Sequence, residues 1–143
     1  MIIYLDTSAL VKKYFKEIGS NDLISKWKEA ESIVTSSVAY AETMAAFYRK
    51  KREVNINENL FETVIQSFHN DWESFIHTEV NDDLNEMIDK MVAFYPLRGF
   101  DAIHLASALI VDETIKKDFL FVCFDQRLST AAQSEGLKTF PAK

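Results

Sequence analysis

The chain opens with Met1-Ile-Ile-Tyr-Leu-Asp-Thr-Ser-Ala-Leu10, in which an apolar run stops at Asp6 and small hydroxyl residues follow. Residues 2–5 do not alternate with polar residues, so they predict a strand covered on both faces, as in a parallel sheet flanked by helices. Asp6 then stands at the carboxyl end of that strand, where ligands and catalytic groups gather in open parallel sheets. The alternative is that Asp6 or Thr7 only caps the following helix by accepting its free backbone N–H groups.

A second continuous apolar run covers residues 119–124 and meets Asp125 at its end. Strands are expected at 2–5, 33–35, 75–80, 119–124 and 137–140, and helices at 8–15, 20–30, 38–52, 60–75, 81–95, 98–113 and 126–135. This alternation predicts a three-layer α/β/α fold with a central, mainly parallel sheet. At this length we expect one domain covering residues 1–143.

The composition indicates an ordered globular protein. Hydrophobic residues make up 48% of the chain, with only 3 Gly and 2 Pro, so a core can form without disulfides and no linker is expected. Cys123 is the single cysteine, which excludes an intramolecular disulfide and a CxxC metal site. The apolar N-terminus is too short for a signal peptide, and no apolar run could cross a bilayer. We therefore expect a cytoplasmic protein with no membrane contact.

The charge distribution argues against a broad nucleic-acid-binding face, since 16 Lys and Arg stand against 22 Asp and Glu, for a net charge of −6. Local basic groups remain: Lys12, Lys13 and Lys16 on the first helix, and residues 49–52 at a helix end. They could contact phosphates beside an acidic site, or they stay solvated where a helix dipole favours cations. Arg98 is the better candidate for a substrate contact, unless it only offsets nearby acids.

Four acidic residues have apolar sequence surroundings. Asp6 and Asp125 each follow an apolar strand, and right-handed crossovers place both at the same sheet edge. Asp101 begins a strongly apolar helix, and Glu42 lies on a helix stripe with Ala45 that is expected to point inward. Each acid alone is explained by capping or by the helix dipole. Together they predict a carboxylate cluster, which would repel itself unless it shared protons or bound a cation.

The donor types indicate which cation such a cluster would bind. The ligands are oxygen atoms, and the sequence has neither a CxxC motif nor a paired-histidine motif, so a hard ion such as magnesium or manganese is expected. Such an ion can lower the pKa of an attached water, orient it towards a phosphorus atom and neutralise the leaving oxygen. A phosphodiester is therefore the expected substrate.

Four segments resemble the motifs of PIN-domain proteins, and most closely those of VapC-like toxin ribonucleases of type II toxin–antitoxin systems. They are Tyr4-Leu-Asp-Thr-Ser-Ala-Leu10, Ala39-Tyr-Ala-Glu42, Arg98-Gly-Phe-Asp-Ala-Ile-His-Leu-Ala-Ser-Ala108 and Phe121-Val-Cys-Phe-Asp-Gln-Arg-Leu128. The first and third segments are individually specific, and the order and spacing of all four extend the resemblance over nearly the whole chain. One departure is Cys123, where a hydroxyl residue is common.

The resemblance implies that Asp6, Glu42 and Asp101 are the core metal-binding acids, with Asp125 as the fourth and a nearby hydroxyl from Thr7 or Ser8. It further implies magnesium- or manganese-dependent cleavage of RNA, a homodimer, and inhibition by a cognate antitoxin. In our working hypothesis Asp6 and Asp101 hold the principal metal, Asp125 supports it or a second ion, and Glu42 positions the attacking water or binds the metal through it.

His104 lies one helical turn beyond Asp101 and invites assignment as a general base. We interpret it instead as a buried helix histidine with local hydrogen bonds and leave it out of catalysis. A further helical stripe, mostly aromatic, is interpreted as core or as a self-association face; it consists of Leu60, Val64, Phe68, Trp72 and Phe75.

Three alternatives stay open at this point. A phosphoryl-aspartate enzyme of the haloacid-dehalogenase type also places an Asp after its first strand, but it normally has a second Asp two residues on, where this chain has Ser8. A binding module, such as a receiver domain or a catalytically silent PIN domain, would tolerate loss of the acids. An RNA-processing PIN nuclease outside a toxin–antitoxin pair is the nearest alternative to a toxin.

Overall fold

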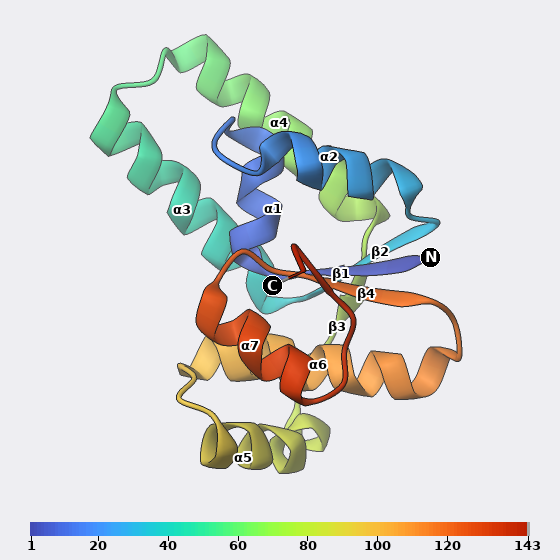
Figure 1. The fold of residues 1–143 in the computed structure, drawn as a ribbon. Coiled ribbons are helices and arrows are strands. Elements are labelled where there is room, and N and C mark those ends of the chain that lie inside the picture. Colours follow the sequence, from blue (N-terminus) through green and yellow to red (C-terminus); the bar gives the residue numbers. More distant parts are fainter. Residues whose placement is uncertain (143) are drawn as a thin grey trace.

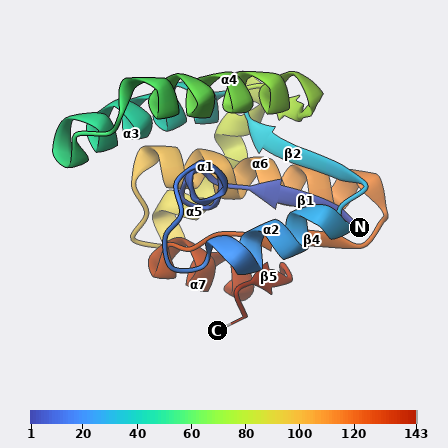
Figure 2. The ribbon, with the colours of Figure 1, turned by 90° about the horizontal axis from the view of Figure 1, so that it is seen from above.

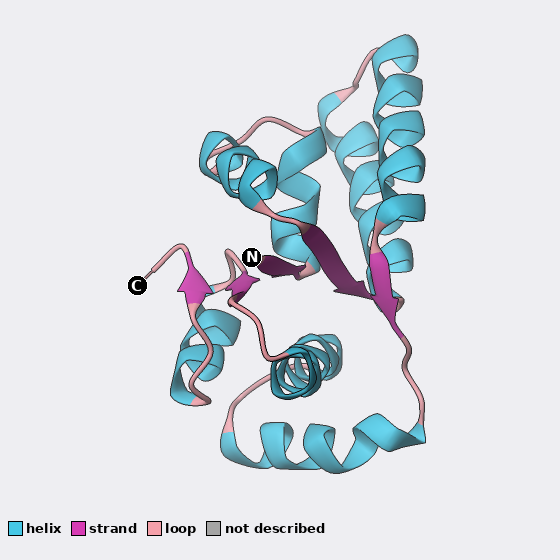
Figure 3. Cartoon of the chain, turned by 90° about the vertical axis from the view of Figure 1, so that its right-hand side faces the viewer, coloured by secondary structure: helices cyan, strands magenta, loops and turns pink. Residues whose placement is uncertain are grey.

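The sheet at the centre of the molecule has five parallel strands in the order β3-β2-β1-β4-β5. The computed structural model describes residues 1–142. The strands are β1 (Ile2–Leu5), β2 (Ser32–Ser36), β3 (Ile76–Thr78), β4 (Phe119–Val122) and β5 (Thr139–Phe140). The parallel α/β/α prediction is therefore confirmed, and Figure 3 shows the strands lying between two groups of helices.

β1 is the middle strand, and it pairs with β2 on one side and with β4 on the other. Alternate side chains point to opposite faces of a strand. Ile3 and Leu5 accordingly join the core on one face, and Ile2 and Tyr4 join the core on the other. All residues of β1 are buried, which explains its unbroken apolar sequence.

The helices form two layers, one on each face of the sheet (Figure 1). The first layer contains α1 (Thr7–Tyr14), α2 (Ser20–Glu29), α3 (Val38–Val54) and α4 (Glu58–Ser74). The second contains α5 (Asn85–Phe94), α6 (Gly99–Ile115) and α7 (Gln126–Ser134), with a 3₁₀ turn at Asp82–Leu84 before α5. Helices α3 and α4 lie side by side and extend beyond the sheet as an arm (Figures 1 and 2).

The rotation of α3 differs from the predicted one. Its buried face carries Ala39, Thr43 and Phe47, so the predicted inward stripe through Ala45 is wrong. On α4 the predicted apolar stripe is confirmed from Val64 onward, and only at its first position is Leu60 57% exposed while Phe61 is buried. The aromatic side chains explain the rotation of α3, because Phe47 packs edge-on against Phe68 of α4, and burying large rings removes more apolar area from water.

Three strands are shorter than the sequence predicts. β3 covers only Ile76–Thr78, and β5 covers only Thr139–Phe140. β4 ends at Val122, so Cys123 and Phe124 form a short connection to α7. Within residues 1–142, no helix combines the length and the apolar character needed to span a membrane.

Candidate active site

Asp6 follows β1 directly and caps α1. Its Oδ1 accepts a hydrogen bond of 3.0 Å from the backbone N–H of Ala9, and the Ser8 hydroxyl lies 2.8 Å from both carboxylate oxygens. Asp6 therefore does cap α1, as the capping alternative predicts. A cap uses only part of the lone-pair capacity of a carboxylate, so capping leaves Asp6 able to bind a cation as well.

Burial sets the electrostatic state of Asp6. Only 3% of this residue is exposed, and it forms no ion pair with any described residue. Burial raises the pKa of Asp6, and the interaction with His104 and the hydrogen bonds from Ser8 and Ala9 offset only part of that rise. A buried carboxylate that forms no ion pair is costly, and a bound cation would reduce that cost.

Glu42 projects from α3 towards the end of β1 and is held by two donors. The Thr7 hydroxyl donates to Glu42 Oε1 over 2.6 Å, and His104 Nε2 lies 2.9 Å from the same oxygen. Half-burial raises the pKa of Glu42, but the hydrogen bonds from His104 and Thr7 outweigh it, so the pKa lies below its usual value. Glu42 is therefore an oriented, ionised carboxylate.

Asp101 and Asp125 come from the helices of the second layer. Asp101 lies in the first turn of α6, where Arg98 Nε stands 3.4 Å from its Oδ2. Asp125 caps α7 through a 3.0 Å hydrogen bond from the backbone N–H of Leu128. The loop before it is tied to the end of β1, because the N–H of Phe124 donates to the Ser8 hydroxyl over 3.0 Å.

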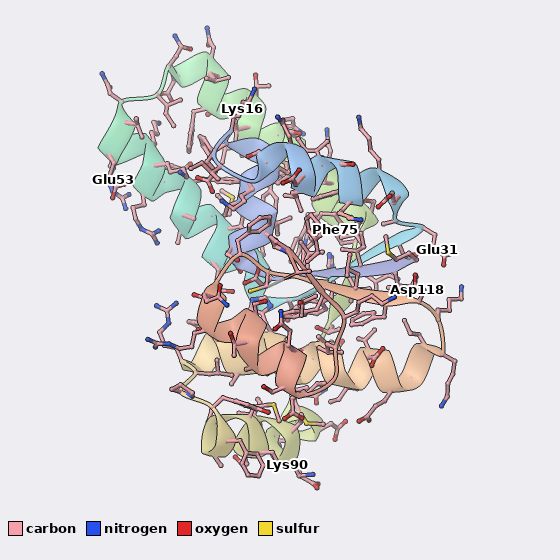
Figure 4. The ribbon with its side chains drawn as sticks, in the orientation of Figure 1. Lys16, Glu31, Glu53, Phe75, Lys90 and Asp118 are labelled. Carbon is pink, nitrogen blue, oxygen red and sulfur yellow. The ribbon has the colours of Figure 1, made fainter. Side chains whose placement is uncertain are left out.

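Asp6, Glu42, Asp101 and Asp125 all line one cavity of about 880 Å³ at the carboxyl edge of the sheet. Hydroxyls and cations line it too, namely those of Thr7, Ser8, Lys12, Arg49, Lys50 and Arg98. Acids at the opposite edge provide a contrast, since Asp118 lies near the start of β4 (Figure 4). The structure therefore brings together every acid that the sequence singled out.

The four acids line the cavity, but their carboxylates do not converge on one point. In residues 1–142, no three His, Cys, Asp or Glu side chains converge closely enough to hold a metal ion. Glu42 is turned towards His104, and Asp101 towards Arg98. The donor set is nevertheless one that a hard divalent ion favours, because it consists of carboxylate and hydroxyl oxygens beside the buried, unpaired charge of Asp6.

Two features of this region were missed by sequence reasoning. His104 is buried, as expected, but it bonds to Glu42 rather than only within its own helix, and its other ring nitrogen lies 2.9 Å from the Tyr4 hydroxyl. The spacing of His104 from Asp101, one helical turn, was the only signal for it. Nothing in the local sequence marks Tyr4.

The second missed feature is a neighbouring cavity of about 720 Å³. It shares Arg98, Asp101 and Asp125 with the acidic cavity and is otherwise lined by residues that include Tyr95, Gln126 and Arg127. The two cavities therefore meet at Asp101 and Asp125.

Comparison with known proteins is consistent with this arrangement. Residues 3–133 match the PIN domain family model. The chain is 31% identical over 146 residues to Ribonuclease VapC45 of Mycobacterium tuberculosis (strain CDC 1551 / Oshkosh), and the match covers 99% of this chain and 96% of that protein. Ribonuclease VapC49 of Mycobacterium tuberculosis (strain ATCC 25618 / H37Rv) matches with the same identity and coverage, 31% and 99% of this chain.

Solved structures share the fold at low sequence identity. FitAcB from Neisseria gonorrhoeae superposes with a TM-score of 0.67 at 11% identity, covering 96% of each chain. The structure of VapBC2 from Rickettsia felis, bound to a DNA fragment from the VapBC2 promoter, superposes with a TM-score of 0.65 at 12% identity, covering 97% of each chain. VapC20 of Mycobacterium tuberculosis, a sarcin-ricin loop cleaving toxin, superposes with a TM-score of 0.61 at 17% identity, covering 90% of this chain and 94% of that one. The family model and the VapC ribonuclease relatives show that the chain belongs to the PIN-domain family.

Proposed function

We propose that the chain is a magnesium- or manganese-dependent endoribonuclease, the toxin of a toxin–antitoxin pair acting in the cytoplasm. The observation that carries this proposal is the cavity where Asp6, Glu42, Asp101 and Asp125 meet at the carboxyl edge of the sheet. The ribonuclease names of the relatives and the likeness to VapBC2 support it. RNA is the substrate, a cognate antitoxin is the inhibitor, and the chain forms a homodimer.

In this proposal Asp6 and Asp101 hold the principal ion, and Asp125 supports it or a second one. Bound there, the ion lowers the pKa of an attacking water and neutralises charge on the leaving oxygen. Ser8 and the N–H of Ala9 keep the carboxylate of Asp6 in one orientation. Glu42 positions the water or binds the ion through it.

The substrate would enter along the basic side chains of the cavity. Lys12 and Lys50 both bind Glu17, at 3.0 and 3.1 Å, so part of their charge is already balanced. The side chain of Arg98 is 79% exposed beside Asp101, against 14% for Lys12 and 32% for Lys50, so it is more accessible to a phosphate than either lysine. A planar guanidinium matches a phosphate with two parallel hydrogen bonds.

The test is cleavage of a mixed RNA pool by the purified protein in magnesium, in manganese and in chelator. We expect wild-type cleavage to require the metal and to fall at least about 100-fold in Asp6→Asn, which removes a metal ligand and its charge. Asp118→Asn is the matched control, because it makes the same change at the opposite sheet edge and should cleave as wild type does. Unchanged cleavage by Asp6→Asn would reject the proposal.

A further inference from the structure

His104 lies between two side chains at the centre of the molecule. Only 2% of the residue is exposed, and it lies on the buried face of α6 with its ring edge-on to that of Tyr4 in β1. Its Nδ1 is 2.9 Å from the hydroxyl of Tyr4, which is fully buried, and its Nε2 is 2.9 Å from Glu42 Oε1. These contacts connect the middle strand of the sheet to an acid of the cavity.

The hydrogen-bond partners decide which ring nitrogen carries the proton. The Tyr4 hydroxyl lies 2.9 Å from His104 Nδ1, which is its closest hydrogen-bond contact among the described residues, and the hydroxyls of Ser107 and Thr78 also lie near it. A proton on Nδ1 would break the bond from the phenol and turn a second donor towards it, which is costly for a buried group. Nδ1 is therefore bare, and Nε2 carries the proton that points to Glu42.

Thr7 fits the same assignment. Its hydroxyl proton is directed to Glu42 over 2.6 Å, and its oxygen lies 3.3 Å from His104 Nε2. The proton on Nε2 can therefore be shared between the carboxylate of Glu42 and the hydroxyl oxygen of Thr7. Each O–H and N–H donor in this group of four side chains then has an acceptor.

We propose that His104 is a positioning residue: the Tyr4 hydroxyl fixes its tautomer, and its Nε2–H holds Glu42 in one orientation towards the acidic cavity. This inference rests on the proposed function for its purpose, since Glu42 would serve the metal site. Both hydrogen bonds to Glu42 end on Oε1, and no described residue donates to Oε2. Oε2 is thus the oxygen left for a metal-bound water or the ion.

The role differs from that of a general base. His104 is 2% exposed, and in this assignment its one ring proton faces the carboxylate of Glu42 while its other ring nitrogen accepts from Tyr4. Groups that orient the ligands of a metal typically change metal affinity by about 10- to 100-fold when they are removed. The expected effect of His104 is therefore on metal binding as well as on turnover.

The first measurement is the affinity of the purified protein for Mn²⁺ alone, by calorimetry. His104→Leu keeps the bulk but removes the donor, and we expect binding about 10- to 100-fold weaker. His104→Gln keeps an N–H near the position of Nε2 and should bind within about threefold of wild type. His69→Leu is the control for the same change on α4, where the histidine bonds to Tyr40 instead, and its affinity should not change.

The second measurement is the ¹⁵N spectrum of the imidazole nitrogens in the metal-free protein. We expect His104 to have a protonated Nε2 and a bare Nδ1, with Glu42→Gln moving the Nε2 resonance and Tyr4→Phe moving that of Nδ1. Any proton on Nδ1 would overturn the assignment. This readout holds even if His104→Leu fails to fold, because it uses the wild-type chain.

The two proposals fail in different ways. Wild-type affinity for Mn²⁺ in a folded His104→Leu variant would overturn the positioning role, even if the protein cleaved RNA. If His104→Leu bound Mn²⁺ more weakly than wild type, but wild type itself did not cleave RNA, the positioning role would be supported and the nuclease proposal rejected.

Discussion

At the scale of single residues, the carboxylate of Asp6 serves both the local fold and the proposed site. It caps α1, yet it is buried with no described cation beside it. Burial raises its pKa, which means that the folded chain bears a cost for the charged form. The buried charge of Asp6 therefore lowers the stability of the folded chain.

This leads to a prediction for Asp6→Asn in the metal-free protein. Asn retains a side-chain oxygen for the helix cap and removes the buried charge. We expect a melting temperature equal to that of wild type or a few degrees higher, measured by circular dichroism in chelator. A large fall in melting temperature would show that the charge of Asp6 stabilises the fold.

Glu17 differs from Asp6 in that its surroundings lower the pKa of its carboxyl group. Partial burial raises its pKa, but the hydrogen bonds and charges of Lys12 and Lys50 outweigh this, and the pKa lies below its usual value. A lowered folded-state pKa adds stability above the unfolded pKa, about 4.3, and that stability is lost as the pH falls through the folded pKa.

We therefore expect wild type to be more stable than Glu17→Gln at neutral pH, by less than about 1 kcal/mol because the pair is solvent-screened. The difference should shrink as the pH falls below about 4, within the window set by the unfolded pKa. Chemical unfolding of both proteins across this range measures it. A difference that does not change with pH would contradict the assignment.

At the scale of elements, the helical arm is held by aromatic packing. Phe68 of α4 is fully buried, and its ring lies 5.5 Å from the rings of both Tyr14 and Phe47. These contacts set the rotation of α3 and α4, and they place Glu42 beside the end of β1. The arm therefore positions one acid of the candidate site.

Truncating this contact should be costly. We expect Phe68→Ala to lower the free energy of unfolding by about 3–5 kcal/mol, because it removes apolar contacts and leaves a cavity. Leu60→Ala on the same helix is the control and should change it by about 0.5 kcal/mol or less, since Leu60 is 57% exposed. Equal losses of unfolding free energy in the two variants would contradict the assignment of Phe68 to the buried face of α4 and of Leu60 to its exposed face.

At the scale of the whole molecule, the two cavities meet where α6 and α7 begin. Arg98 lines both, and Arg127 lines only the smaller one. Arg127 forms no ion pair with a described residue, so its charge is available to a phosphate beyond the acidic cavity. In the proposed nuclease, an RNA strand that reaches the acids could continue across this surface.

We predict that Arg127→Gln weakens binding of RNA to the chelated protein by about 3- to 10-fold at low salt, through loss of a phosphate contact. The slope of the logarithm of affinity against that of salt should fall by about 0.7. Lys117→Gln is the control, because Lys117 lies just before β4, at the other edge of the sheet. Equal weakening by both variants would indicate a general charge effect.

Local sequence patterns are sufficient to predict the parallel sheet and the positions of two of the candidate acids. Unbroken apolar runs at residues 2–5 and 119–122 require cover on both faces, and an acid near the end of each run lies at the carboxyl edge of a parallel sheet. These are local patterns, so they can be read from neighbouring residues alone. They are enough to predict that Asp6 and Asp125 lie near each other.

Only the tertiary structure decided the rotation of α3 and the contacts of His104. Glu42 is 62 residues from His104, and Tyr4 is 100 residues from it, so no local pattern could pair them. The rotation of α3 followed from ring packing, in which several apolar faces compete and the largest buried area is favoured, whereas the longer apolar stripe of α4 predicted most of its buried face. The same packing brought Glu42, His104 and Tyr4 together, because side chains on separate elements meet only after those elements have docked.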